Sequence, residues 1–128
     1  MKFAVIARLF YQPHATETMD ETWRKILEAF KIAKNSTDRP WELQDKLRKI
    51  LPSVVSVGDD LSFTVKLNKE VEVNEDKILS LGAKRTRIYP FKNAYRFEKG
   101  YVAIEGKFIR ISREIDEGLL RKILEALS

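Results

Sequence analysis

The chain has 128 residues, of which 44% are hydrophobic and 34% are charged, and its 24 Lys and Arg against 19 Asp and Glu give a formal net charge of +5. No cysteine is present, which excludes disulfides, thiolate metal sites and thiol nucleophiles, and no apolar run approaches the ~18 residues that a membrane span needs. Length and composition therefore predict a cytoplasmic protein with one domain over residues 1–128 and one hydrophobic core. The abundance of Lys, Arg and Glu is typical of thermophile proteins.

The N-terminal part of the chain combines one strand pattern with two helix patterns. Residues 2–11 are rich in Val, Ile, Phe and Leu, which predicts a strand. A first helix is predicted from a capping box that Thr18 opens, and it ends at Asn35. A second helix is predicted from an N-cap at Asp38 to the break at Pro52. Its exposed charges alternate in sign, which indicates a solvated face rather than a helix that reads nucleic acid.

A hairpin and a short helix are predicted in the middle of the chain. The hairpin joins residues 54–57 to residues 61–67, where apolar and polar residues alternate. A further strand is predicted over residues 70–73. Asn74 then opens a short helix, which ends at Gly82 because glycine readily adopts the left-handed conformation that follows a helix.

The tip of the hairpin, Gly58-Asp59-Asp60, is similar to the carboxylate pair with which polymerase palms hold magnesium ions. Such a site needs a further carboxylate on a neighbouring strand, and the predicted first strand carries none. We interpret the three residues as an ordinary hairpin turn. No nucleophile elbow, P-loop, dinucleotide-binding glycine pattern or histidine pair occurs. We therefore expect no catalytic residue, no metal site and no cofactor, and a binding protein rather than an enzyme.

Residues 84–113 are the most distinctive stretch of the chain. They hold nine basic residues against two acids, and six of the thirteen aromatic residues, so the stretch is near +7 while the rest of the chain is near −2. Turn signals divide it into four short predicted strands, which cover residues 84–89, 94–98, 101–105 and 107–112. An apolar stripe at helical spacing predicts a final helix over residues 116–127.

The order of these elements predicts an α+β fold with a mostly antiparallel sheet and the helices on one face. The first elements fit a ferredoxin-like split βαβ core, which the C-terminal β-meander and helix would extend. A helix-grip arrangement has a similar order of elements, with a ligand cavity under the last helix, and is the alternative. Either arrangement leaves one face of the sheet to water or to a partner.

Alternation along the predicted strands sorts the basic stretch into two sets of side chains. The inward set is apolar or aromatic and comprises Ile88, Tyr95, Phe97, Val102, Ile104, Ile109 and Ile111. The outward set carries arginines and aromatic rings and comprises Arg85, Arg87, Tyr89, Arg96, Tyr101, Phe108 and Arg110. Four lysines would add positive charge around it, namely Lys84, Lys92, Lys99 and Lys107.

The outward set predicts a nucleic-acid-binding domain, because guanidinium groups pair with phosphates and exposed bases stack on aromatic rings. The ligand would be single-stranded or structured RNA or DNA. The alternative is a protein–protein interaction domain or a homodimeric adaptor, because Tyr and Arg are also the residues of interface hot spots. The basic residues do not line one amphipathic helix, so we expect no membrane partner.

Overall fold

The computed structural model describes residues 19–127. Its helices and strands follow one another in the order α2 (Met19–Lys34), α3 (Pro40–Ile50), β1 (Val54–Val57), β2 (Phe63–Lys66), α4 (Glu75–Ser80), β3 (Lys84–Ile88), β4 (Phe91–Arg96), β5 (Tyr101–Glu105), β6 (Phe108–Ile111) and α5 (Glu117–Ala126). The predicted strand over residues 2–11 and the capping residue Thr18 lie outside the described residues. Within residues 19–127, no helix has the length and apolar content to cross a lipid bilayer.

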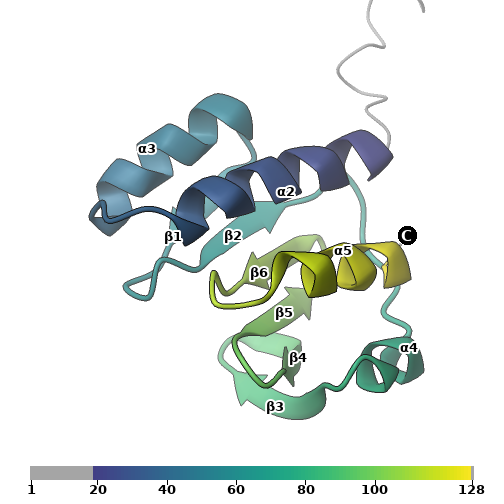
Figure 1. Ribbon diagram of the computed structural model, residues 1–128. Coiled ribbons are helices and arrows are strands. Elements are labelled where there is room, and N and C mark those ends of the chain that lie inside the picture. The colour runs from purple at the N-terminus through teal and green to yellow at the C-terminus, as the bar shows by residue number, and fades with distance from the viewer. Residues whose placement is uncertain (1–18, 128) are drawn as a thin grey trace, which may run out of the picture.

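The strands form one sheet in the order β1-β2-β6-β5-β4-β3, and every neighbouring pair is antiparallel. Helices α2, α3 and α5 lie side by side on one face of this sheet, with α2 in the middle (Figure 1). The short helix α4 lies at the end of the sheet that β3 forms (Figure 1). The predicted α+β class, the antiparallel sheet and the one-sided helices are confirmed.

The strand order differs from a ferredoxin-like order in one respect. Strand β6 pairs with β2 along its whole length, at the place that a ferredoxin-like order gives to the first strand of the chain. The C-terminal meander therefore joins the β1–β2 hairpin through its last strand, and β3 becomes an edge strand. The predicted strand over residues 70–73 is wrong for a related reason: the edge of β2 beside it is already taken by β6, and Val71 only donates its amide to Gly106 O.

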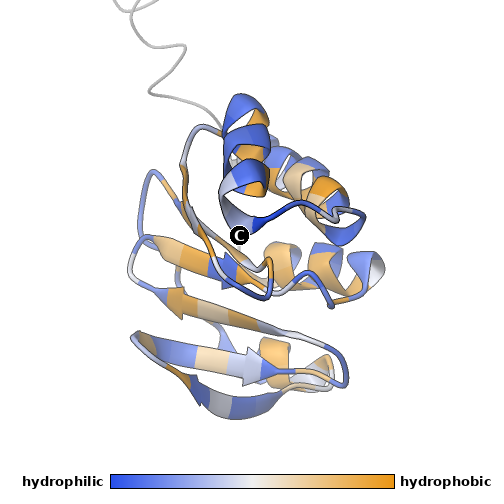
Figure 2. Cartoon of the chain, turned by 90° about the vertical axis from the view of Figure 1, so that its left-hand side faces the viewer, coloured by the Kyte–Doolittle hydropathy of each residue, from blue (hydrophilic) through white to orange (hydrophobic). Residues whose placement is uncertain are grey.

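The core lies between the sheet and the helices. Of the predicted inward set, all members except Ile88 are buried, and Ile88 is partly exposed on the edge strand. They pack against apolar residues of all three covering helices, among them Ile26, Phe30, Leu43, Leu47, Leu120 and Ile123. Figure 2 shows the consequence in hydropathy: the central strands are mostly hydrophobic, whereas β3 at the bottom of the view is mostly hydrophilic.

The local signals for turns and caps are partly confirmed. Asn74 caps α4 by accepting a hydrogen bond from the amide of Lys77, and Gly82 adopts φ +101° just after that helix. The N-cap of α3 is Arg39 rather than the predicted Asp38, because Pro40 occupies the first helical position directly after it. Asp38 instead forms an ion pair with Lys46 at 2.6 Å.

Candidate nucleic-acid interface

The sheet has a covered face, which packs on the helices, and an open face on the other side. Cross-strand partners in an antiparallel sheet point to the same face, so the register assigns each side chain. Tyr95 pairs with Val102 on the covered face, whereas Arg96 pairs with Tyr101 on the open face. The open face of the meander carries, from alternation and register, Lys84, Thr86, Ala94, Arg96, Tyr101, Ala103, Glu105, Phe108 and Arg110. The predicted outward orientation of Arg96, Tyr101, Phe108 and Arg110 is confirmed.

The predicted outward orientation of Arg85 is wrong. Arg85 pairs with Tyr95, whose ring is fully buried in the core, so Arg85 lies on the covered face at the edge of the sheet. Between the pairs Thr86–Ala94 and Ile88–Phe91, β3 advances by two residues and β4 by three, so the extra residue of the bulge lies in β4. Strand β3 itself keeps its alternation, with Lys84, Thr86 and Ile88 on one side and Arg85 and Arg87 on the other. The bulge in β4 brings Ile88 opposite Phe91, so taking Ile88 as inward misplaces Arg85 and Arg87.

Arg85 has partners that account for its charge. Its guanidinium forms an ion pair with Glu75 of α4, and Nη1 lies 3.5 Å from the Tyr95 hydroxyl. The Tyr95 hydroxyl in turn donates a hydrogen bond to Glu75 Oε1 at 2.9 Å. Burial and the neighbouring Glu75 carboxylate together raise the pKa of Tyr95. These contacts tie α4 to the edge of the sheet, which is a structural role.

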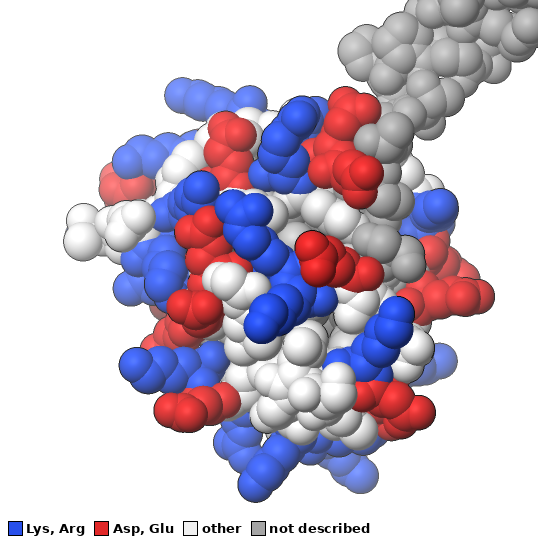
Figure 3. All heavy atoms as spheres, turned by 45° about the vertical axis from the view of Figure 1, so that its right-hand side comes forward, with Lys and Arg blue, Asp and Glu red and all other residues white. Residues whose placement is uncertain are grey.

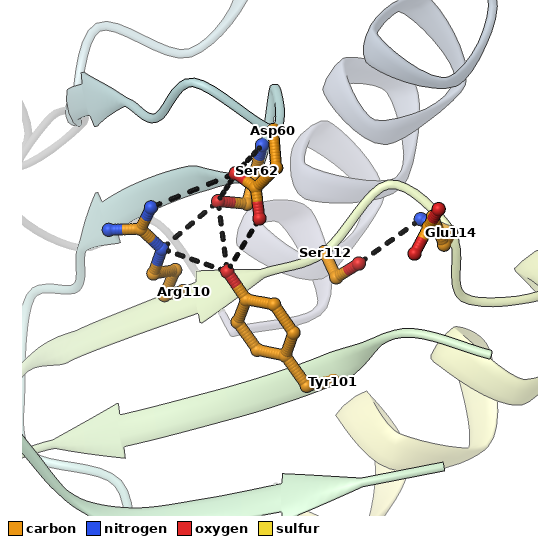
Figure 4. Close-up of polar contacts among 6 residues, drawn as sticks. All are labelled: Asp60, Ser62, Tyr101, Arg110, Ser112 and Glu114. Atoms are coloured by element: carbon orange, nitrogen blue, oxygen red, sulfur yellow. Dashed lines mark hydrogen bonds and ion pairs between the residues drawn. The ribbon is translucent and has the colours of Figure 1, made fainter. Parts of the chain in front are cut away.

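Arg110 also has partners, and they come from the loop before β2 and from β5. Its Nε donates hydrogen bonds to Ser62 Oγ at 3.0 Å and to the Tyr101 hydroxyl at 3.2 Å (Figure 4). Its Nη2 lies 3.8 Å from Asp60 Oδ1. Ser62 Oγ donates to Asp60 Oδ1 at 2.6 Å, and the Tyr101 hydroxyl donates to Asp60 Oδ2 at 3.1 Å. We call these four residues the Arg110 cluster.

The Arg110 cluster gives Asp60 a structural role. Burial tends to raise the pKa of this carboxyl, but hydrogen bonds from Ser62 and Tyr101 and the charge of Arg110 outweigh burial, so the pKa lies below its ordinary value. Gly58 makes room for the cluster, because a Cβ at this position would lie 2.2 Å from Arg110 Nη2. Over residues 19–127, no three His, Cys, Asp or Glu side chains gather closely enough to hold a metal ion.

The remaining cations on the β3–β4 hairpin form no ion pair with any described residue. Lys84 and Arg96 are direct cross-strand partners on the open face, and both are exposed. No acid among the described residues forms an ion pair with either side chain. We call them the Lys84–Arg96 pair. Like charges directly opposite one another destabilise a sheet, by a few tenths of a kcal/mol up to about 1 kcal/mol.

Four further cations from the predicted set surround the hairpin. Lys99 lies in the turn after β4, near the Lys84–Arg96 pair, and Arg87 and Lys92 lie toward the β3–β4 turn. Lys107 lies in the β5–β6 turn. All four are exposed, and none forms an ion pair with a described residue. Figure 3 shows Lys and Arg side by side at the lower end of the molecule, where β3 lies, whereas both signs of charge mix over the part above.

The three predicted aromatic contacts differ in accessibility. Tyr89 lies in the β3–β4 turn and is 95% exposed, whereas Phe108 on the open face is 36% exposed. Tyr101 is partly buried and its hydroxyl is held within the Arg110 cluster (Figure 4). Sequence reasoning did not single out Trp41, which is 60% exposed on α3 with the Arg39 guanidinium 5.3 Å from its ring centroid.

Sequence reasoning also missed the groups that neutralise two of the predicted arginines. Asp60 and Ser62 precede β2, and Ser62 lies 48 residues before Arg110 in the chain. Glu75 is 10 residues from Arg85 and belongs to a different element. No local spacing rule links residues at these separations. Of the eleven predicted residues, the structure brings Lys84, Arg96 and Lys99 together at one end of the hairpin, with Arg87, Tyr89 and Lys92 toward its turn.

Comparison with known proteins gives one clear relative. An uncharacterized protein of Archaeoglobus fulgidus is 52% identical over 103 residues, which span 80% of this chain and 93% of that protein. No model of a known protein family matches the chain, and no solved structure matches it.

Proposed function

This chain belongs to the same protein family as the Archaeoglobus fulgidus protein, and we propose that it is a nucleic-acid-binding domain. The proposed interface is the open side of the β3–β4 hairpin. Lys84, Arg96 and Lys99 would neutralise phosphates at one end of it and Lys92 toward the other, with Arg87 exposed along the free edge of β3. Lys107 adds diffuse attraction from the next turn. Arg85 and Arg110 are left out, because Glu75 and Asp60 already balance their charges.

The single observation that carries this proposal is the Lys84–Arg96 pair. Edge strands often carry charged side chains that prevent them from pairing with other chains. A carboxylate beside such a cation would not impair this protective role. Here two cations face each other directly without a described carboxylate partner, which costs stability. A phosphate placed between the two side chains would remove that repulsion and gain two charge-assisted hydrogen bonds.

Salt dependence is the first test of the proposal. A labelled oligonucleotide should bind the purified protein in a fluorescence anisotropy titration. With four phosphate contacts on a single strand, raising salt from about 50 mM to about 200 mM should weaken binding about 50-fold, because each contact releases counterions. Binding that is absent, or that does not change with salt, contradicts the proposal.

A pair of double variants tests the location of the interface. Lys84→Gln with Arg96→Gln should weaken binding and reduce the salt slope by about 0.7 on a single strand, because the phosphate that the two side chains share is no longer bound. The matched control is Arg48→Gln with Lys49→Gln, which removes the same charge from exposed positions on α3. If both double variants lose affinity equally, net charge alone drives binding and the assigned interface is wrong.

A protein-binding function is the second candidate, and Trp41 is the observation that favours it. A tryptophan that is 60% exposed and stacked by an arginine has the composition of an interface hot spot. This surface would bind another protein or a second copy of the chain. Sedimentation of the wild type and of Trp41→Ala tests the homodimer: a dimer that Trp41→Ala dissociates supports it, and a monomer at all concentrations excludes it.

A further inference from the structure

Tyr89 is the most exposed of the large hydrophobic residues that the structure leaves at the surface. Tyr89 is 95% exposed at the tip of the β3–β4 hairpin, between the ends of two strands that carry exposed cations. A tyrosine normally buries 150–250 Å² of surface in a core or an interface. At this position it adds nothing to the core, so its ring is available to a ligand.

The other two outward aromatic residues are less suited to that role. The Tyr101 ring lies toward the loop before β2, where its hydroxyl contacts Asp60 and Arg110 (Figure 4). Phe108 is only 36% exposed, and its cross-strand partners are Lys66 and Glu105. The Glu105 carboxylate, which also accepts the amide of Lys92, would repel a phosphate close to Phe108. Tyr89 is therefore the aromatic residue best placed for a base.

The position of Tyr89 relative to the cations indicates how a ligand would lie. Lys84 and Tyr89 are five positions apart along β3, so an extended strand separates them by up to about 17 Å. Lys92 of β4 lies between these two ends, and Arg87 lies between them along the free edge of β3. A chain of phosphates could follow the hairpin from the Lys84–Arg96 pair to its tip, where the base of one nucleotide would meet the Tyr89 ring.

We propose that the ligand is single-stranded nucleic acid, with one unpaired base stacked on Tyr89. This inference rests on the proposed nucleic-acid-binding function and adds the class of ligand. Bases in a duplex are paired and stacked on both sides, so an exposed ring at a hairpin tip cannot reach their faces without opening the helix. An unpaired base offers its face directly, and every base has one, so stacking on Tyr89 requires no particular sequence.

The test compares three anionic probes on the wild type and three variants. The probes are a labelled oligothymidylate of about 12 nucleotides, a blunt duplex of similar length, and inorganic polyphosphate as a competitor. Tyr89→Ala should weaken binding of the single strand about tenfold, and Tyr89→Phe should retain it, because phenylalanine preserves the stacking ring. Trp41→Ala removes another exposed aromatic residue, from α3, and should bind the single strand as the wild type does.

The probes separate failure of this inference from failure of the proposed function. Equal binding of the single strand by Tyr89→Ala and the wild type overturns the stacking role, as does an equal loss of affinity for all three probes. A wild type that prefers the duplex overturns the assignment of a single-stranded ligand while nucleic-acid binding stands. A wild type that binds none of the three probes at low salt removes the proposed function itself.

Discussion

The Arg110 cluster and the Lys84–Arg96 pair lie on the same face of the sheet and illustrate two uses of positive charge. In the Arg110 cluster, one arginine is only 25% exposed and has a carboxylate, a serine and a tyrosine as partners. In the Lys84–Arg96 pair, two cations on the edge strand and its neighbour face each other in solvent without a described acid. Partly buried charges must be paired to be stable, whereas exposed cations remain available to an external anion.

The difference between the two groups lies in what packs beside them. The loop before β2 lies next to β5 and β6, and it brings Asp60 and Ser62 within hydrogen-bond distance of Arg110. Strand β3 is an edge strand, so the Lys84–Arg96 pair has a neighbouring strand on one side only. We therefore expect substitutions in the Arg110 cluster to change stability, and substitutions in the Lys84–Arg96 pair to change binding.

The largest expected effect on stability is that of Arg110→Met. Methionine keeps much of the apolar stem but removes both hydrogen bonds of Nε and the charge beside Asp60, which leaves the buried Ser62 hydroxyl with fewer partners. The free energy of unfolding should fall by about 1–3 kcal/mol, measured by chemical denaturation. Arg96→Met is the matched control on the same face and should change it by less than about 0.5 kcal/mol. Equal losses in the two variants would contradict the distinction.

A smaller loss of stability is expected for Tyr101→Phe. This change removes only the hydroxyl that contacts Asp60 Oδ2 and Arg110 Nε, and it keeps the ring. The free energy of unfolding should fall by about 1 kcal/mol, as is usual for one hydrogen-bonding group. Tyr89→Phe serves as the control, because no described residue contacts the Tyr89 hydroxyl through a hydrogen bond, and its stability should match the wild type.

The Lys84–Arg96 pair should respond to charge reversal with opposite changes in stability and binding. Lys84→Glu places a carboxylate directly across from Arg96, so the free energy of unfolding should rise by roughly 0.2–1 kcal/mol. Nucleic-acid affinity should fall in the same variant, because one phosphate contact becomes repulsive. Lys84→Gln, which removes repulsion without adding attraction, should lie between the two in stability. A variant that loses both stability and affinity would show that Lys84 has a structural partner.

The smallest expected effect is a pH dependence that arises in the Arg110 cluster. The pKa of Asp60 is lower in the folded protein than its ordinary value of 3.8, so the folded state favours the ionised carboxylate. Its contribution to stability is present above about pH 4 and is lost as pH falls further, through the folded-state pKa. Asp60→Asn should therefore show a flatter loss of stability below about pH 4 in acid denaturation. Asp59→Asn, which removes the adjacent exposed carboxylate, is the matched control, and an equally flattened curve for it would contradict the role of Asp60.

Much of the architecture could be read from local pattern. Alternation correctly assigned the buried side chains of β4, β5 and β6, and turn residues located the ends of β5. The pattern failed at Arg85, because an extra residue in β4 interrupts the alternation of the β3–β4 hairpin, so the apolar Ile88 does not mark the covered face of β3. A bulge leaves no signature in residue type alone, so alternation cannot detect it.

The sequence alone determined that this protein has an α+β fold and that positive charge concentrates in residues 84–113, because periodicity and composition are properties of the chain itself. Only the tertiary structure decided which of those cations form ion pairs within residues 19–127. That depends on whether a carboxylate from a distant segment lies within a few ångströms, as Asp60 does for Arg110 and Glu75 for Arg85. Electrostatic energy depends on distance in space, and the packing of the sheet sets those distances.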